Sequence, residues 1–502
     1  MTRPLVTSGA SGLLQEEPLI FERSVPGRRA AWPRPLDVPP ADDLDPALLR
    51  AVPPRLPEVS EPDVVRHHTR LSQRNYGIDA GFYPLGSCTM KHNPRVSEDL
   101  AALPGFGGLH PNQPVSSVQG ALRVMVELED ALAEITGLDA VTLQPSAGAH
   151  GEFTGLLIVR AAHEARGDAR RRILIPESAH GTNPASATLC GYETVEVPAG
   201  PDGVMLPESV RSLMAPDVAG LMVTHPNTVG LYETHLREIC AVVHDGGGLV
   251  YGDGANLNAL MGVARPGDVG IDVMHVNLHK TFSTPHGGGG PGAGPVAVRA
   301  ALAPYLPRPV IQRGERLAID WDRPLSIGKV RSFYGNFGVL VRAWTYVRQM
   351  GGPGLSWASR MAVLNANYLR ARLGASYEVA FDRPCMHEVI LTDRRQRPHG
   401  VETMDIAKAL MDHGFHPPTV YFPLVVPHAL MVEPTESESL DEMDAFVAAM
   451  EAVARQASED PASLHAAPWR SYRRRLDEVL AAKSPDLRYT WPSPEGSASG
   501  GD

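Results

Sequence analysis

The chain has 502 residues, too many for one small core, and its hydrophobic content of 43% and charged content of 21% are ordinary for a globular protein. Its net charge of −11 excludes nucleic acid and an anionic membrane surface as expected partners. No apolar run approaches the roughly 20 residues of a spanning helix, and the N-terminus lacks the apolar core of a secretory signal. The four cysteines form no C-x-x-C pair, so we expect a cytoplasmic protein without a disulfide framework or a bound metal.

The N-terminal part of the chain predicts an extended arm followed by alternating strands and helices. Residues 25–65 are rich in proline, which favours an extended segment that wraps a surface. Apolar residues at three-to-four spacing predict a helix from about residue 120, capped by Gly137. Four strand-like runs then alternate with helical stretches (strands 171–176, 220–226, 247–253 and 273–278; helices 155–166 and 236–244). This alternation predicts an α/β fold with a mostly parallel sheet and helices on its faces.

The pattern changes at about residue 340, where helical runs precede strand-like segments near 377–392 and 429–433. We therefore expect four parts: an N-terminal arm and substrate-loop region (1–120), a large domain (121–335), a small α+β domain (336–480) and a tail (481–502). The tail is polar and rich in small residues, which is typical of disorder.

A single lysine, Lys280, occupies the segment from 272 to 295, between a strand-like run and a glycine-rich loop. Glycine lets a backbone approach a bound ligand closely, and ligands collect at strand ends of parallel sheets. A lysine in this place is typical of a Schiff base with a carbonyl cofactor, of which pyridoxal phosphate is the common one. The alternative is a structural lysine in a glycine loop.

Three other strand ends carry residues that suit the same cofactor. Ser146, Ala147 and Gly148 precede a helical run, and small residues at a helix start present free N–H groups to a phosphate. His180 follows the first strand, where an imidazole can stack on a pyridine ring; a capping histidine is the simpler reading. Asp253 ends the third strand, where a carboxylate can hold a pyridine nitrogen protonated; an Asx-turn is the simpler reading there.

The order of these signals along the chain is phosphate loop, stacking histidine, pyridinium partner and Schiff-base lysine, and four such residues at successive strand ends favour pyridoxal phosphate over chance. The motif G-x-x-x-x-G-K-[ST] of a P-loop is absent, as is the G-x-S-x-G elbow of a hydrolase.

Several longer motifs carry a resemblance to a known family. The chain contains YPLGSCTMKHNPR, LPGFGGLHPNQP, IPESAHGTNPASA, DGANLNA, NLHKTFSTPHGGGGPGAGP and MVEPTESES. In these motifs it resembles glycine decarboxylase, the P-protein of the glycine cleavage system, and in particular subunit 2 of its two-subunit form. The resemblance spans nearly the whole chain, to about residue 475.

This resemblance implies the type I fold of pyridoxal-phosphate-dependent transferases, with Lys280, His180 and Asp253 in the roles given above. It also implies that His279 contacts the cofactor phosphate. The implied reaction is decarboxylation of glycine, with transfer of the aminomethyl group to the lipoyl arm of H-protein. The implied partners are a companion subunit 1, in a heterotetramer, and lipoylated H-protein.

The chain departs from the common family pattern at two places, Ser146-Ala147 and His225, which leaves side-chain contacts to the cofactor open there. Cys88, in YPLGSCTMK, is either a redox-sensitive thiol or a buried spectator. Two other readings stay open: a different pyridoxal-phosphate enzyme that binds a substrate carboxylate through an arginine such as Arg383, and a subunit that keeps the fold without the cofactor.

Overall fold

The computed structural model describes residues 17–32, 34–39, 44–287, 292–471 and 473–491. The chain divides into two compact units, one formed by residues 1–77 with 466–502 and the other by residues 78–465. The predicted boundaries at 121, 336 and 481 concern a finer division and stay a prediction. Of the predicted disordered tail, residues 492–502 lie outside the described residues. No helix in the described part of the chain is long and apolar enough to cross a membrane.

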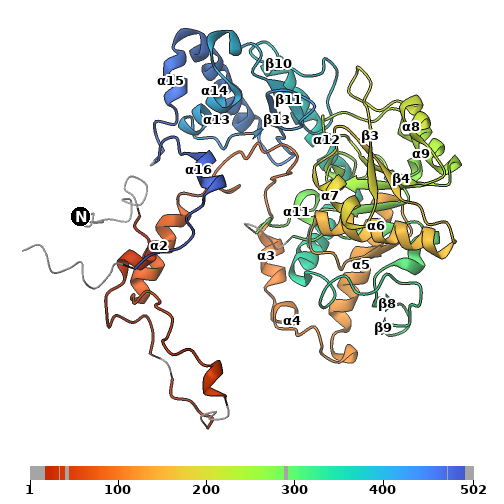
Figure 1. Cartoon of the computed structure of the whole chain (residues 1–502), viewed down its shortest axis with the longest axis horizontal. Helices are drawn as coiled ribbons and strands as arrows, with labels where there is room; N and C mark the ends of the chain where they lie inside the picture. The colour runs from red at the N-terminus through yellow and green to blue at the C-terminus, as the bar shows by residue number, and fades with distance from the viewer. Residues whose placement is uncertain (1–16, 33, 40–43, 288–291, 472, 492–502) are drawn as a thin grey trace, which may run out of the picture. The chain divides into compact units, whose positions relative to one another are not determined.

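The first unit contains little regular structure. Its helices are η1 Ile20–Arg23, η2 Pro46–Leu48, α2 Glu61–Ser72 and α16 Glu478–Lys483 (Figure 1). Helix α2 begins with a capping box, in which the Ser60 side chain accepts the N–H of Asp63 and the Asp63 carboxylate returns to the Ser60 backbone. Inside the unit, the buried Glu17 carboxylate lies 2.9 Å from Nδ1 of His67. Between Ser24 and Ser60, the described residues form only the short helix η2, and residues 61–65 belong to α2; the extended arm stays a prediction.

The second unit is built on a seven-stranded sheet with the order β1-β7-β6-β5-β4-β2-β3. Its strands are β1 Ala140–Thr142, β2 Arg172–Pro176, β3 Glu193–Val197, β4 Val218–Thr224, β5 Leu249–Gly254, β6 Val273–Val276 and β7 Val296–Val298. Strand β7 runs antiparallel to β1 and β6, and the remaining pairs are parallel. The predicted α/β fold with a mostly parallel sheet is confirmed.

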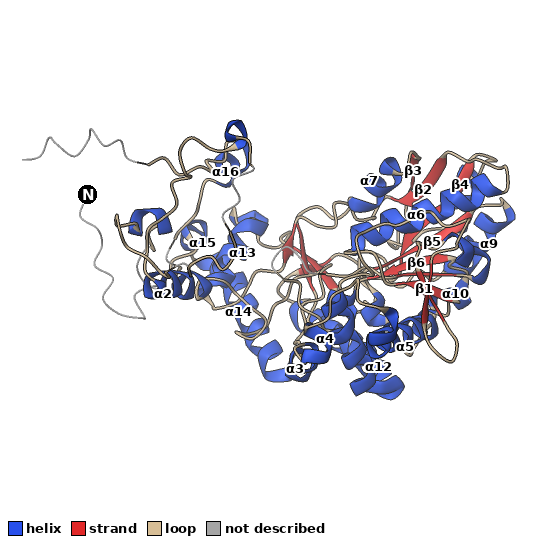
Figure 2. Ribbon diagram, turned by 90° about the horizontal axis from the view of Figure 1, so that it is seen from below, coloured by secondary structure: helices blue, strands red, loops and turns tan. Residues whose placement is uncertain are grey.

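Helices cover both faces of this sheet (Figure 2). The helices that accompany the sheet strands are α5 Gln119–Thr136, α6 Gly148–Ala165, α7 Thr182–Leu189, α8 Pro207–Leu213, α9 Leu236–Asp245, α10 Pro266–Val269 and α11 Leu278–Thr281. Strand β2 shows why both faces are apolar: Leu174 packs in a core with α5 and α9, whereas Ile173 and Ile175 pack in a separate core with α6. Alternate side chains of a strand point to opposite faces, so a strand buried on both sides is apolar throughout.

A second, four-stranded antiparallel sheet has the order β10-β11-β13-β12. It consists of β10 Glu378–Val379, β11 Val389–Thr392, β12 Thr419–Val420 and β13 Ala429–Val432, with the helices α12 Phe337–Leu373, α13 Thr403–Asp412, α14 Leu440–Glu459 and α15 Pro461–Ala466. The kink in α12 lies at Gly351, whose φ of 60° is unsuited to a helix, just before Pro353. The remaining elements of the unit are α3 Arg95–Ala101, α4 Pro104–Gly107, the short helices η3 Val115–Ser117, η4 Leu257–Ala259, η5 Ala300–Tyr305 and η6 Arg397–His399, and the hairpin β8 Val310–Gln312 with β9 Ala318–Asp320.

The sequence prediction located the four central parallel strands and the helices α5 and α9 to within a few residues. It missed β1, β3 and β7. It also began α6 too late, since the helix starts at Gly148 rather than near residue 155. The three missed strands are short or have exposed residues, so neither an apolar run nor a clear alternation marks them.

Candidate active site

A cavity of about 230 Å³ lies at the carboxyl ends of β4, β5 and β6. Most of the residues that line it are polar, and they come from segments far apart in the sequence: Ser87, Gly148, Ala149, Glu152, His180, Thr182, Thr224, Thr228, Asp253, Ala255, Asn256, His275, Asn277, His279 and Lys280. Ligands of open parallel sheets bind at this edge, because the strands end there and their connections diverge. The cavity brings together five of the six predicted site residues, and the sixth, Ala147, lies one residue from its wall.

Lys280 extends into the cavity from the short helix α11, four residues after the end of β6. Its Nζ donates a hydrogen bond to the backbone carbonyl of Ser87, at 2.8 Å. That partner is a neutral carbonyl, so the amine is held in place without being committed to an ion pair. A carbonyl ligand in the cavity can therefore reach the amine.

Asp253 is buried at the end of β5, and its carboxylate is held by three neighbours. Oδ2 accepts a hydrogen bond from Nδ2 of Asn183 at 3.0 Å, and Oδ1 accepts the N–H of Ala255 at 2.9 Å. Nε2 of His275 lies 3.4 Å from Oδ1. Burial by itself raises the pKa of Asp253, but His275, Asn183, the Ala255 N–H and the Lys280 charge hold it below its ordinary value. The cavity thus contains a carboxylate that stays ionised.

His275 was not predicted, although it orders this part of the site. Its Nδ1 lies 2.6 Å from the Tyr251 hydroxyl, and its Nε2 donates to Oδ1 of Asn277 at 2.7 Å. In the sheet, Asp253 pairs directly with His275 on the neighbouring strand. The sequence carried one usable signal: His275 and Asn277 are two residues apart on one face of the strand that leads to Lys280.

The first turn of α6 forms another wall of the cavity. Ala147 is the N-cap residue and makes no side-chain capping bond, so the N–H groups of the first turn lack the usual partner. Gly148 packs against Asn277, and a Cβ at that position would lie 2.5 Å from the Asn277 amide nitrogen. An uncapped helix start beside a cavity is suited to an anion such as phosphate.

His279 also lies at this wall, where its Nδ1 accepts the N–H of Ala293 at 3.3 Å. Burial, together with the neighbouring His286 and Lys280, lowers the pKa of His279 to about 3, so the imidazole is neutral. Ser146 does not line the cavity; its hydroxyl accepts a hydrogen bond from Arg331 at 2.8 Å.

His180 lies beyond β2 and lines the cavity from its exposed side. Its Nδ1 lies 2.9 Å from the hydroxyl of Thr182, and that hydroxyl donates to the buried carboxylate of Glu152 at 2.8 Å. The contacts with Thr182 and Glu152 therefore orient the imidazole, and its ring centre lies 5.5 Å from that of Phe422.

These residues fit pyridoxal phosphate. A lysine amine, an ionised carboxylate and an uncapped helix start border one cavity, which matches the aldehyde, the ring nitrogen and the phosphate of that cofactor. In addition, the hydroxyl of Thr224, at the end of β4, is buried without a hydrogen-bond partner among the described residues. A polar ligand in the cavity would satisfy this hydroxyl.

Three other residues singled out in the sequence lie outside the cavity lining. His225 is buried beside Tyr232, and burial lowers the pKa of its imidazole to about 4. Arg383 lines a separate hollow together with Asp202 and Phe381. Sγ of Cys88 lies 3.3 Å from Nε2 of His286, and burial raises the pKa of this thiol, so the sulfur is held as a thiol rather than as a reactive thiolate.

The chain has the type I fold known from pyridoxal-phosphate-dependent transferases. It is similar to a crystal structure of glycine decarboxylase (P-protein) of the glycine cleavage system in inhibitor-bound form, with a TM-score of 0.70 and 23% identity over 82% of this chain and 93% of that one. It is also similar to sphingosine-1-phosphate lyase from Burkholderia pseudomallei K96243, with a TM-score of 0.60 and 14% identity over 83% and 95% of the two chains. These likenesses confirm the predicted fold.

Comparison of sequences identifies the family. Residues 38–315 match the model of the glycine cleavage system P-protein, and residues 358–466 match that of the glycine dehydrogenase C-terminal domain. A protein of Caldanaerobacter subterraneus subsp. tengcongensis named probable glycine dehydrogenase (decarboxylating) subunit 2 is 55% identical, over 94% of this chain and 98% of its own. A protein of the same name from Halalkalibacterium halodurans is 54% identical, over 95% and 98%. The chain belongs to the glycine cleavage system P-protein family.

Proposed function

We propose that this chain is the pyridoxal-phosphate-binding subunit of a glycine dehydrogenase (decarboxylating). The reaction releases the carboxylate of glycine as CO2 and transfers the aminomethyl group to one sulfur of the lipoyl disulfide on H-protein. The electron pair of the broken C–C bond forms the new C–S bond, and the second sulfur leaves as a thiol after taking a proton. The observation that carries this proposal is the cavity in which Lys280 and the ionised Asp253 lie together, in a chain more than half identical to proteins of that name.

Pyridoxal phosphate, when bound, supplies a sink for the electrons released at the carbon that loses CO2. Lys280 is the residue that would bind the cofactor covalently through its amine. Asp253 would hold a proton on the ring nitrogen, because its own charge is fixed by His275 and Asn183. The N–H groups at the start of α6 and the neutral His279 would hold the phosphate, and His180 would cover the ring from the exposed side.

The decisive test is exchange of labelled CO2 into the carboxyl group of glycine. The assay combines this chain with its companion subunit and lipoylated H-protein, with alanine and serine run in parallel. We expect label in glycine only, and only when H-protein is present. No exchange from a preparation that carries a cofactor Schiff base would overturn the proposed substrate.

The covalent role of Lys280 has its own test. Lys280→Ala should remove the borohydride-reducible link between protein and cofactor, and peptide mapping should find the reduced cofactor on Lys280 in the wild type. Lys329→Ala, an exposed lysine outside the cavity lining, is the matched control and should keep the link. A reducible link that survives in Lys280→Ala would refute the assignment.

The partners are part of the same proposal. Relatives that carry the words subunit 2 in their names support a companion subunit 1, and we propose a heterotetramer of the two in the cytoplasm. The proline-rich arm exposes large apolar side chains, among them Trp32, Leu36 and Leu48, each about four-fifths exposed. Apolar groups on an extended segment suit burial against another protein, so we assign the arm to contact with the companion subunit.

A different pyridoxal-phosphate reaction is the second candidate, with Arg383 as the residue that binds a substrate carboxylate. Its position favours the glycine reaction instead. Arg383 lines a hollow other than that of Lys280, and none of the described residues that line the cavity is an arginine.

A further inference from the structure

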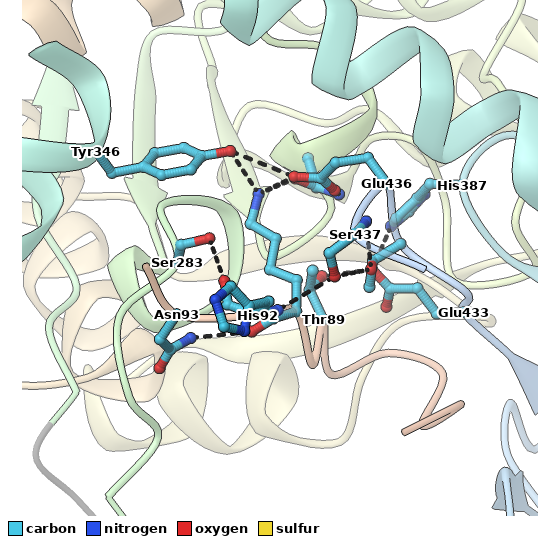
Figure 3. Close-up of polar contacts among 12 residues, drawn as sticks. Thr89, His92, Asn93, Ser283, Tyr346, His387, Glu433, Glu436 and Ser437 are labelled. Atoms are coloured by element: carbon cyan, nitrogen blue, oxygen red, sulfur yellow. Dashed lines mark hydrogen bonds and ion pairs between the residues drawn. The ribbon is translucent and has the colours of Figure 1, made fainter. Parts of the chain in front are cut away.

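The carbonyl that holds Lys280 belongs to a loop, residues 87–93, which a second segment, residues 433–437, holds in place (Figure 3). The hydroxyl of Thr89 donates a short hydrogen bond to Glu433, and the backbone N–H of His92 donates to the hydroxyl of Ser437 at 3.1 Å. Beside them, Lys91 lies 2.7 Å from the carboxylate of Glu436. The loop is thus attached to two carboxylates with different surroundings.

Glu436 has a cation of its own. Lys91 is buried and donates from its Nζ to Glu436, to Oδ1 of Asn258 at 2.9 Å and to the Tyr346 hydroxyl at 3.2 Å. Burial by itself lowers the pKa of Lys91, but Glu436 and Tyr346 outweigh this and raise it above its ordinary value. Lys91 and Glu436 therefore form an ion pair whose charges cancel.

Among the described residues, no lysine or arginine forms an ion pair with Glu433. It forms a cluster with His387 and Glu388, in which one nitrogen or oxygen atom of each side chain lies within 4.8 Å of the others. The three residues are at most 1% exposed. Both ring nitrogens of His387 and Oε2 of Glu433 lack a hydrogen-bond partner among the described residues. Burial and the Lys280 charge lower the pKa of His387 to about 3, so this imidazole supplies no positive charge.

The cluster reaches the cavity through Ser87. This residue donates its backbone N–H to Oε2 of Glu388 at 2.9 Å, and its carbonyl accepts the hydrogen bond from Lys280. Its φ of 63° lies in the left-handed region, which costs a residue with a side chain on the order of 1 kcal/mol. Oε1 of Glu388 lies 3.5 Å from Nδ2 of Asn256, a second residue of the cavity wall. Glu388 is therefore linked to the amine of Lys280 through one intervening residue, Ser87.

The electrostatics of the cluster follow from these contacts. Burial raises the pKa of Glu388 to about 7, against the effects of the Ser87 N–H and Lys280. Burial and the charge of Glu388 raise the pKa of Glu433, against Thr89 and Lys280, with Glu436 adding to the repulsion. Cys88 also faces the cluster as a neutral thiol. Two carboxyl groups this close cannot both ionise easily. Among the described groups that affect the pKa of both Glu388 and Glu433, Lys280 is the one with a positive charge.

We propose that Glu388 and Glu433 share one proton and one negative charge, and that this pair is the counter-charge of Lys280. When the amine of Lys280 loses its charge, the pair takes up a second proton, and when the charge returns, the pair releases it. The two glutamates are positioning residues, since they act on Lys280 through Ser87 and through their field. The inference deepens the proposed function, because only covalent chemistry at Lys280 would require its charge to change.

The first test needs no cofactor and no substrate. Infrared difference spectra of the cofactor-free protein at pH 8, where burial still keeps one of the two carboxyl groups neutral, report the C=O stretch of that group as wild type minus variant. We expect Glu433→Gln and Glu388→Gln each to remove the whole band of the pair, and the double variant to remove no more than either. Glu98→Gln is the control and should leave the band in place, because Arg342 holds the pKa of the Glu98 carboxyl group below its ordinary value.

Two independent neutral acids would each remove half of the signal, and two ionised carboxylates would give no difference band. Either result would overturn the shared proton. Binding of Mn²⁺ to the wild type but not to Glu433→Gln would also overturn it, because the cluster would then be a cation site.

A second variant keeps the test valid if a glutamine substitution prevents folding. Lys280→Met removes the cation and leaves both glutamates, so we expect the neutral carboxyl signal of the pair to double. An unchanged signal would show that the pair does not respond to Lys280.

The assembled enzyme supplies the functional readout. In the glycine–CO2 exchange assay, Glu433→Gln should remove the step near pH 7 from the pH–rate profile, whereas a structural defect would scale the rate at every pH. Absence of exchange in the wild type would refute the proposed function but leave the infrared result standing. The two failures are therefore distinguishable.

Discussion

At the scale of single residues, the cavity separates two kinds of buried carboxyl group. Asp253 is kept ionised by His275, Asn183 and a backbone N–H. Glu388 lies only one residue behind the cavity wall, yet burial raises its pKa to about 7. The difference arises from the charge of His275 and from the hydrogen bonds of Asn183 and Ala255, because both side chains are buried. One site thus contains a permanent charge and a titratable one.

The permanent charge leads to the first prediction. Asp253→Asn keeps the size of the side chain but removes the charge that would hold the ring nitrogen protonated. A neighbouring charge shifts a pKa by roughly one to three units, or about 1.4 to 4 kcal/mol, so we expect a loss of roughly 10- to 1,000-fold in the exchange rate. Absorbance should show that the cofactor stays bound. Near-normal turnover would mean that another residue serves the ring nitrogen.

At the scale of elements, the loop that carries Ser87 is positioned by β13. Leu85 forms an antiparallel bridge with Val432, and the N–H of Gly86 donates to the carbonyl of Met431 at 3.2 Å. The hydroxyl of Thr419, on β12, donates to the Gly86 carbonyl at 2.7 Å. The four-stranded sheet therefore sets the position of a carbonyl that binds Lys280 in the cavity of the seven-stranded sheet.

Gly86 is the sensitive point of this contact. A Cβ there would lie 2.3 Å from Cγ and 2.7 Å from the carbonyl oxygen of Met431. We expect Gly86→Ala to cost about 1 to 3 kcal/mol and to weaken cofactor retention. Thermal melts and cofactor absorbance after dialysis measure the two effects. Gly120→Ala, in α5 with open space around it, should leave both unchanged; equal behaviour of the two variants would argue against the close contact.

Helix α5 provides a prediction about pH. Burial raises the pKa of Glu129 to about 8, despite Arg313, whereas its usual value is 4.5. A carboxyl group whose folded pKa is raised stabilises the fold while it is neutral, and this contribution is lost as the pH rises from about 4.5 through 8. Each pKa unit corresponds to about 1.4 kcal/mol, so the loss is on the order of a few kcal/mol.

Glu129→Gln should therefore raise the melting temperature relative to the wild type at pH 8, with a smaller difference at pH 5. Glu134→Gln is the control. This carboxylate lies on the same helix but is exposed and pairs with Arg265 instead, so it should show no such trend. A difference that does not depend on pH would mean that Glu129 is ionised in the folded protein.

At the scale of the whole molecule, the two units differ in how they are stabilised. The second unit contains two apolar cores, one on each face of its large sheet. The arm of the first unit instead exposes a series of large apolar side chains: Trp32, Leu36, Val38, Leu44, Leu48, Leu49, Val52 and Leu56. Such a series is unusual for a segment that stays in water, which is why we assign it to the companion subunit.

A double substitution tests this assignment. The double variant Trp32→Ser/Leu48→Ser should need a protein concentration at least tenfold higher than the wild type to co-elute with the companion subunit in size-exclusion chromatography. Its cofactor absorbance should stay unchanged. Arg50→Ser, an exposed polar position on the same arm, is the control. Unaltered co-elution of the double variant would exclude these side chains from the interface.

Much of the fold and part of the site could be predicted from the sequence, and the reason is the same for both. Lys280 and His180 follow strands that apolar runs mark, and Asp253 lies at the end of another, so their common edge of the sheet could be inferred. His387, Glu388 and Glu433 could not be predicted, because they lie just before β11 and just after β13, and these short strands give no signal that the loop at Ser87 lies against them. The pairing of β13 with Leu85 is a tertiary contact that local patterns do not contain.

The attachment of the loop at Ser87 also bears on the order in which the protein folds. Its contacts join residues 301 and 344 positions apart, from Ser87 to Glu388 and from Thr89 to Glu433. Closing such long stretches of chain is slow compared with forming local contacts. During synthesis, Lys280 leaves the ribosome more than a hundred residues before either glutamate. The large sheet can therefore form early, but the lysine acquires its neighbours only when the last third of the chain has been made, so the nascent enzyme stays inactive until it is nearly complete.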